Sequence, residues 1–577
     1  MTLLDDDLEY LKDLEVEIGS TLPKIQDVRS YSIGYREKDG VVESLCLFAG
    51  GLERIPNLII SFTNLKQLYL RGNNITIFPE ELCYSDSIEL LDLSENRIKS
   101  IPGEIHSLKS LREFHLESND LNNIPENIGL LENLEYLDIS GNKLNTIPNS
   151  IGKLANLTFL DLSNNEINSL PEQIGMLKSL KLLYLGNNNL KELPESIENL
   201  ISLNRLNIRN NQLNKLPISI GGLKELTSLF LKGNNLEELP DSLGSITNLK
   251  YLGLKQNKIK SLPSSIGSLN KLENLSLLNN KIEAIPNTIG NLSSLMRFDL
   301  QNNTITYLPD SIGKLKSLKI LWLSNNKLKK FPNTISDLNQ LELLKLNQNE
   351  LKNLPSLIGD LKSLKELDLF DNKIAQIPES IGYLKYLEIL DLSSNQLENL
   401  PKSLCNLESL KELDLSKNKL TELPACIGNL THLKNLILGF NLLEKIPHSI
   451  GRLRNLETLD LGKNNLTSIP ETLRSLTNLK FLYLYYNNLF TIPQDIGQLQ
   501  NLEYFNISNN KLEFLPESIG LLSSLEYLFL KSNKITELPK SMKKFASIKH
   551  LNLEKNVFKD THKVLEELKK NKIQLIL

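Results

Sequence analysis

The chain has 577 residues, 23% of them charged, and its 65 basic and 69 acidic side chains leave a formal net charge of -4. A balance so close to neutral argues against nucleic acid or a membrane surface as the main partner. No apolar run reaches the roughly 18 residues of a membrane span, and Met1 precedes an acidic segment unlike a signal peptide, so we expect a cytoplasmic protein.

Residues 1–41 are predicted to form an N-terminal helical cap. Within them, Leu4, Leu8, Leu11 and Leu14 recur at nearly helical spacing. The stack of repeats that follows would otherwise expose apolar core at its first member, and such an end needs a cover. We therefore expect the helix to lie over the first repeat.

Residues 42–558 are predicted to form about 23 repeats of 23 residues. Asparagine recurs at every twenty-third position from Asn73 to Asn556, and proline keeps the same interval from Pro56 to Pro539. In the first, degenerate repeat Gly50 replaces the asparagine. A fixed interval of this size is typical of a solenoid, in which each repeat contacts its neighbours.

Each repeat is expected to contain a short strand, an asparagine turn and an outer segment. In one repeat, Leu229 and Leu231 alternate with period two, as in a strand with one face inward. Asn234 follows, and its buried amide has two donors and two acceptor lone pairs for backbone groups. Pro240 then precedes a short helix or turn. The predicted fold class is α/β, with a parallel concave sheet and short helices or turns on the convex side.

Residues 559–577 are predicted to form a C-terminal helical cap. Asp560 is a candidate N-cap for a helix over residues 561–571, with Val564, Leu565 and Leu568 facing inward. Residues 573–577 are expected to add a last short strand.

The sequence offers no recognisable chemical site. Its four cysteines are predicted to form neither a metal-ligand cluster nor a disulfide framework, and its six histidines fit no local metal-ligand pattern. Walker-type glycine loops, GxSxG and HExxH are absent from the sequence. We therefore predict no catalytic, metal-binding or cofactor-binding residue; an enzyme with an unrecognised site is the alternative.

Aromatic residues gather on strand positions that alternate with the core and so face the concave surface. The segment from Phe481 to Tyr486 is predicted to be one strand, and the next two strands carry further rings at matching positions. Exposed apolar patches mark interaction sites, although aromatic residues also suit strands and stack across sheets. The candidate partner-binding residues are Phe440, Phe481, Tyr483, Tyr485, Tyr486, Tyr504, Tyr527 and Phe529.

Other concave positions carry charge or isolated rings. A basic cluster of Arg205, Arg209, Lys232 and Lys255 lies on adjacent predicted strands and suits an acidic partner loop. Trp322, the single tryptophan, occupies the central concave column. A weaker aromatic patch comprises Tyr69, His115, Tyr136, Phe159 and Tyr184.

The consensus LxxLxLxxNxLxxLPxxIGxL resembles the leucine-rich repeat in its 23-residue LPxxIG form. That form occurs in the Ras-group proteins, such as the Ras–RAF scaffolds, Scribble and Erbin, and in plant intracellular, bacterial and archaeal proteins. The resemblance covers about residues 42–558. It implies a curved horseshoe that binds protein, with a Ras-like small GTPase or an associated signalling protein as the partner class.

These observations favour a monomeric scaffold or adaptor in signal transduction that binds partner proteins on its concave face. The first alternative is a secreted or host-directed effector that binds a foreign protein. A passive spacer is the other alternative, and its concave aromatic residues would not contribute to binding.

Overall fold

The chain folds into two compact units built from the same repeat. The computed structural model describes residues 5–29, 31–559, 562–570 and 574–577. The first unit comprises Met1–Ile282 and Asn291–Leu295, and the second comprises Glu283–Gly290 and Met296–Leu577.

The first unit begins with helix α1 (Asp5–Ile18) and an antiparallel pair of strands, β1 (Ile33–Lys38) and β2 (Val41–Leu47). Strand β2 then pairs in parallel with β3, and each further strand of the unit pairs in parallel with the next. The remaining strands of this unit are β3 (Gln67–Tyr69), β4 (Leu90–Asp92), β5 (Glu113–His115), β6 (Tyr136–Asp138), β7 (Phe159–Asp161), β8 (Leu182–Tyr184), β9 (Arg205–Asn207), β10 (Ser228–Phe230), β11 (Tyr251–Gly253) and β12 (Asn274–Ser276).

The strands of the second unit are also paired in parallel with one another, and helix α2 (His562–Lys570) lies in the sequence between its last two strands. Its strands are β13 (Arg297–Asp299), β14 (Ile320–Trp322), β15 (Leu343–Lys345), β16 (Glu366–Asp368), β17 (Ile389–Asp391), β18 (Glu412–Asp414), β19 (Asn435–Ile437), β20 (Thr458–Asp460), β21 (Phe481–Tyr483), β22 (Tyr504–Asn506), β23 (Tyr527–Phe529), β24 (His550–Asn552) and β25 (Gln574–Ile576).

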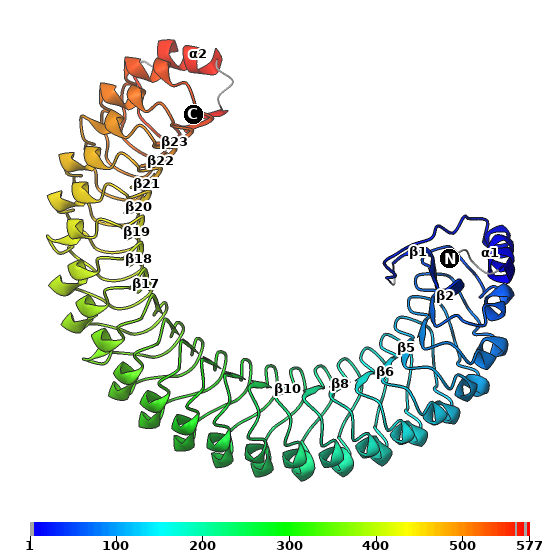
Figure 1. Ribbon diagram of the computed structural model, residues 1–577. Coiled ribbons are helices and arrows are strands. Elements are labelled where there is room, and N and C mark those ends of the chain that lie inside the picture. The colour runs from blue at the N-terminus through cyan, green and yellow to red at the C-terminus, as the bar shows by residue number, and fades with distance from the viewer. Residues whose placement is uncertain (1–4, 30, 560–561, 571–573) are drawn as a thin grey trace. The chain divides into compact units, whose positions relative to one another are not determined.

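Within each unit the strands form the inner layer and short 3-10 helices form the outer layer (Figure 1). The 3-10 helix of one repeat, Asp241–Ser245, follows Pro240 and buries Leu243. A Cβ added to Gly244 would clash with the backbone oxygen of Ser265, so the glycine allows the next repeat to approach closely here. Buried leucines fill the space between the layers, which confirms the predicted solenoid.

The asparagine of each repeat joins it to the repeat before. The Nδ2 of Asn234 donates to the carbonyl oxygens of Ile208 at 2.9 Å and Leu231 at 3.0 Å. Its Oδ1 accepts a hydrogen bond of 3.0 Å from the backbone N–H of Leu213. The same pattern recurs along both units, as the sequence predicted for this residue.

The N-terminal segment contains more than a helix. Leu11 and Leu14 of α1 are buried, Leu8 is 40% exposed, and Leu4 lies outside the described residues. Strand β1 was missed by the sequence analysis, which had assigned only a helix to residues 1–41. It pairs with a seven-residue β2, whereas the strands from β3 onward have three residues.

The C-terminal segment contains α2 and the short strand β25. Val564 and Leu568 of α2 are buried and Leu565 is half-buried. The candidate N-cap Asp560 and the first residue of the expected last strand, Ile573, lie outside the described residues. The boundaries at residues 41 and 558 stay predictions. No helix in the described part of the chain has both the length and the apolar character to cross a membrane.

The structure corrects the expectation that the cysteines form no disulfide. Cys405 and Cys426 are joined, with their Cα atoms 5.8 Å apart. They lie 21 residues apart, so the 23-residue stacking places them on neighbouring outer turns. Cys46 and Cys83 are free and buried.

The asparagine contacts predict a large and specific loss of stability in one variant. Asn395→Ala removes donors to the carbonyls of Leu369 and Leu392 and the acceptor for the N–H of Ile374. Because an unsatisfied buried polar group costs about 1–3 kcal/mol, the free energy of unfolding should fall by at least that amount in urea denaturation. The exposed Asn465, replaced by alanine, is the control and should change it by less than about 0.5 kcal/mol. Equal losses in the two variants would contradict the role of the buried amide.

Candidate functional site

The first and third residues of each three-residue strand flank a buried residue and face away from the core. In β22, for example, Tyr504 and Asn506 flank Phe505, which is fully buried. These positions and the turn residues that follow each strand form the surface that we call the sheet face. Corresponding residues lie on neighbouring strands in parallel register, such as Tyr504 beside Phe481 and Tyr527.

Seven rings form a connected cluster on the sheet face of the second unit, here named the aromatic surface. Tyr504 is its centre, with ring centroids 5.1 Å from Tyr483, 5.9 Å from Tyr527 and 5.2 Å from Phe529. The members are Tyr483, Tyr485, Tyr486, Tyr504, Tyr527, Phe529 and His550.

The structure corrects the predicted six-residue strand that was to carry four of these aromatic residues. Strand β21 ends at Tyr483, so Tyr485 and Tyr486 lie in the turn beyond it. The ring of Tyr485 packs over Gly462, where an added Cβ would come within 2.7 Å of three ring atoms. Phe481 is half-buried on β21, and in the described part of the chain its ring contacts none of the seven.

Phe440 reaches the aromatic surface through a lysine. The Nζ of Lys463 lies 4.3 Å from the ring centroid of Phe440 and 5.4 Å from that of Tyr486. The three residues occupy equivalent turn positions in successive repeats, each with a positive φ. Phe440 is 41% exposed and Tyr486 is 54% exposed. A cation held between two rings is a favourable arrangement that leaves part of each ring accessible to a partner.

Three tyrosines of this surface, Tyr483, Tyr485 and Tyr504, carry hydroxyl groups that are held in the neutral form. Burial raises the pKa of Tyr483, Tyr485 and Tyr504 above the ordinary value of 10.0. Burial also raises the pKa of Asp460, whose Oδ1 accepts a hydrogen bond of 2.8 Å from the backbone N–H of Gly462. The surface therefore combines apolar ring faces with hydroxyl donors, a composition typical of protein-binding sites.

Trp322 belongs to the same unit but not to the aromatic surface. It lies on β14, far along the sheet from β21, beside Asp299 and Lys345 in register. Its Nε1 is buried, and in the described part of the chain it has no hydrogen-bond partner.

The basic cluster of the first unit lines a hollow of 410 Å³ on the sheet face. The structure brings together all four predicted cations there and adds three aromatic rings. Its lining comprises Tyr184, Arg205, Asn207, Arg209, Phe230, Lys232, Tyr251, Leu252, Gly253, Lys255, Asn274 and Ser276.

Four residues of the predicted weaker patch form a row of neighbouring rings nearer the N-terminus, of which the Tyr136–Phe159 pair is stacked. The centroids of His115 and Tyr136 lie 4.6 Å apart, those of Tyr136 and Phe159 4.1 Å, and those of Phe159 and Tyr184 5.6 Å. Tyr69 is 8% exposed and makes no ring contact with the described aromatic residues, so the structure excludes it from this row.

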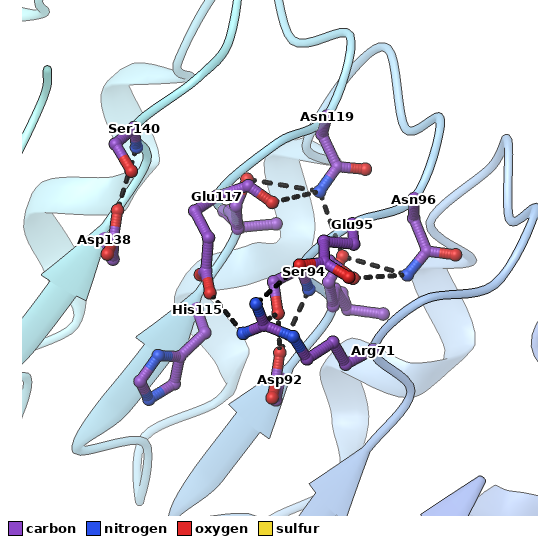
Figure 2. A network of polar contacts seen from close by, with 12 residues as sticks. Arg71, Asp92, Ser94, Glu95, Asn96, His115, Glu117, Asn119, Asp138 and Ser140 are labelled. Atoms are coloured by element: carbon purple, nitrogen blue, oxygen red, sulfur yellow. Dashed lines mark hydrogen bonds and ion pairs between the residues drawn. The ribbon is translucent and has the colours of Figure 1, made fainter. Parts of the chain in front are cut away.

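An arginine network borders this row, as Figure 2 shows. Arg71 donates to Glu95 at 2.6 Å and to Glu117 at 2.7 Å, and so spans three repeats. Beside it, burial raises the pKa of Asp138 to about 6. In the described part of the chain, no group of three His, Cys, Asp or Glu side chains is placed to hold a metal ion.

Three contributors to these sites were not predicted from the sequence. His550 extends the aromatic surface with a centroid 4.9 Å from that of Phe529, Lys463 bridges Phe440 to Tyr486, and Gly253 opens the basic hollow. Alignment of the repeats at intervals of 23 residues contains the signal for His550, which aligns with Tyr527, and for Lys463, which aligns with Phe440 and Tyr486. For Gly253 the same alignment shows only that a glycine stands where the preceding repeat has Phe230.

Family comparisons identify the repeat throughout most of the chain. A model described as a leucine-rich repeat region matches residues 104–183, 149–208, 240–305, 297–373, 367–441 and 471–572. A second, described as leucine rich repeat, matches residues 63–121 and 431–489. A search of curated proteins finds no match.

Several solved structures are similar to the chain. The plant peptide hormone receptor RGFR1 in complex with RGF2 is 29% identical with a TM-score of 0.68, covering 91% of this chain and 92% of its own. A leucine-rich-repeat protein of Leptospira interrogans is 31% identical with a TM-score of 0.52, covering 81% and 95%. The Arabidopsis receptor kinase HAESA, in complex with the peptide hormone IDA and the co-receptor SERK1, is 27% identical with a TM-score of 0.64, covering 99% and 97%.

The raised pKa of Asp138 predicts a pH-dependent effect of Asp138→Asn. The folded-state pKa of about 6 exceeds the ordinary 3.8, so wild type loses stability as the pH rises between these values. The asparagine stays neutral. Its free energy of unfolding relative to wild type should therefore rise by about 1 kcal/mol from pH 4 to pH 7 in urea denaturation, since partial exposure screens the charge.

Asp120→Asn is the control, because the pKa of Asp120 is shifted in the opposite direction from that of Asp138. A hydrogen bond from Lys143 lowers the pKa of Asp120, so its carboxylate contributes stability above the ordinary pKa. This variant should lose stability relative to wild type as the pH rises toward the ordinary pKa of 3.8, and the difference should then change little from pH 4 to pH 7. Parallel pH profiles for wild type and Asp138→Asn would contradict the assignment.

Proposed function

Because the chain belongs to the leucine-rich-repeat family, we propose that it is a protein-binding scaffold or adaptor whose aromatic surface binds a partner protein. The cluster of half-buried and exposed rings on β21–β24 is the observation that carries this proposal. The rings lie opposite the buried leucines and fill no core. Exposed apolar patches on folded proteins mark interaction sites, and tyrosines are frequent hot-spot residues.

The repeat itself does not require aromatic residues at these positions. The residues that precede Tyr483 in the same column of the sheet face are Asp414, Ile437 and Asp460. Polar and apolar residues thus satisfy the same strand geometry, so the choice of a ring at Tyr483 is free to serve binding. The plant receptors with similar structures are described in complex with peptide hormones, which supports a peptide or protein ligand for this chain.

The proposal also includes a class of partner protein and a cellular compartment. The LPxxIG motif resembles that of the Ras-group proteins, and this resemblance supports a Ras-like small GTPase or an associated signalling protein as the partner. The same resemblance supports a cytoplasmic role in signal transduction. A direct binding assay against a panel of purified Ras-like GTPases, each in its GDP-bound and GTP-bound form, tests this choice.

The aromatic surface predicts that two tyrosines govern partner capture. In affinity capture from a native lysate, Tyr483→Ala/Tyr504→Ala should lower recovery of at least one partner about tenfold or more, because truncated hot-spot residues each cost about 2 kcal/mol. The matched control is Tyr383→Ala/Tyr386→Ala, which removes two tyrosines that are 61% and 64% exposed outside the sheet face. The control should recover every partner of wild type.

Thermal denaturation of the three proteins separates lost binding from lost folding. Equal recovery of all partners by wild type and Tyr483→Ala/Tyr504→Ala, with similar unfolding midpoints, would remove the aromatic surface as the binding site and favour the passive spacer.

The Cys405–Cys426 disulfide favours a second candidate function, a secreted or host-directed effector that binds a foreign protein. Disulfides persist in oxidising compartments, whereas cytosolic thiols are kept reduced. The two functions therefore differ in the redox state that the pair has in the native setting.

The two functions are distinguished by alkylating the free thiols of the protein as its own cells are lysed and then measuring the mass of each cysteine-containing peptide. The cytoplasmic scaffold predicts a mass increase at Cys426, and the secreted effector predicts protection of Cys405 and Cys426. Burial raises the pKa of Cys46 and Cys83 to about 12, so these thiols stay unreactive in the folded chain and do not confuse the readout. Protection of Cys426 would overturn the cytoplasmic assignment.

A further inference from the structure

A row of basic side chains crosses three neighbouring repeats of the first unit. Arg209, Lys232 and Lys255 each lie two residues beyond the end of a strand, on β9, β10 and β11. Neighbouring strands are about 4.8 Å apart, so like charges in such a row repel one another. In the described part of the chain no ion pair links Arg209 or Lys232 to a carboxylate.

Basic residues at the same position in other repeats are paired. Arg71 contacts Glu117 at 2.7 Å, and Lys531 contacts Glu554 at 2.6 Å, with both carboxylates at the equivalent position one or two repeats on. In both cases a carboxylate at the equivalent position one or two repeats on neutralises the basic side chain. Asp161 is the carboxylate that Arg209 influences: burial raises the pKa of Asp161, and Arg209 offsets part of that rise from two repeats away.

The row borders a hollow with an aromatic floor. The third strand position, which carries Phe230 on β10, is occupied by Gly253 on β11, so no side chain fills the sheet face there. A Cβ on Gly253 would meet Phe230 at 3.5 Å, an ordinary contact, so packing does not require glycine. The guanidinium carbon of Arg205 lies 5.8 Å from the ring centroid of Phe230, and Tyr251 is 42% exposed beside it.

We propose that this hollow binds an acidic segment of a protein partner. An apolar side chain of the segment lies on Phe230 and in the space above Gly253, while carboxylates on either side of it pair with Arg209 and Lys232. The volume of 410 Å³ suits one or two side chains. The chain as a whole carries a charge of -4, so its attraction for an acidic segment is local to this row.

The site lies in a different unit from the aromatic surface, so the two are tested separately. The probes are a short acetylated peptide in which glutamates flank a central phenylalanine, and the same peptide with glycine in place of phenylalanine. Binding to the full chain is measured by fluorescence anisotropy at low ionic strength. Arg209→Gln/Lys232→Gln should weaken binding of the phenylalanine peptide about tenfold or more, and added salt should weaken binding to wild type.

Two further variants separate this site from general charge. Lys153→Gln/Lys191→Gln removes the same charge from exposed positions of the same unit and should bind as wild type does. Gly253→Leu keeps the charge but fills the hollow, so it should weaken binding of the phenylalanine peptide and leave the glycine peptide unaffected. Equal affinity of wild type and Arg209→Gln/Lys232→Gln, or an equal loss in the lysine control, would overturn the proposal, as would unchanged phenylalanine-peptide binding by Gly253→Leu.

Discussion

One buried amide in each repeat holds the stack in register. Asn418, for example, donates to the carbonyls of Leu392 and Leu415 and accepts from the N–H of Leu397, so it joins its own turn to that of the preceding repeat. An insertion or deletion in one repeat would move this amide away from its partners and leave several buried polar groups unsatisfied. The constant interval of 23 residues follows from that requirement.

The same turn imposes a cost on the residue before the asparagine. That residue has a positive φ in repeat after repeat, and the position usually holds Asn, Ser, Gly, Gln or Lys. Phe440 and Tyr486 occupy it with φ values of 57° and 51°, a conformation that bulky residues rarely adopt. Strain of this kind persists where the surrounding structure or a function compensates for it. Lys463 between the two rings supplies one compensation, and partner binding by the two rings, as proposed above, would supply a functional one.

The regular spacing of leucine, asparagine and proline was enough to predict the solenoid and the sheet face. Each of these residues has the same role in every repeat: leucine fills the core, asparagine bonds to the adjacent turn and proline precedes the outer helix. Alternation along a strand also predicted Tyr483, Tyr504, Tyr527 and Phe529 on one surface. It placed Tyr485 and Tyr486 on the same surface but in the wrong element, because the strand ends at Tyr483 and Tyr486 lies in the left-handed turn that follows.

Contacts between repeats explain the other differences from prediction. The pairing of Cys405 with Cys426 depends on which residues meet on neighbouring outer turns, and counting cysteines along the chain does not reveal it. Strand β1 lies outside the 23-residue frame, so the interval carries no information about it. The hollow forms because Gly253 has no side chain. It could not be predicted from that glycine alone, because its walls are formed by residues of adjacent strands.

Recognition in such a stack is therefore encoded across repeats more than along any one of them. Arg71 and Arg209 have equivalent positions, yet the position two repeats further on holds Glu117 for the first arginine and Lys255 for the second. Arg71 therefore forms an ion pair within the chain, whereas Arg209 belongs to the row of basic side chains that borders the hollow. Since the backbone frame is the same in both places, the side chains one and two repeats away decide whether a charge stabilises the chain or is available to a partner. We therefore expect a single substitution at such a neighbouring position to change the charge that the sheet face presents.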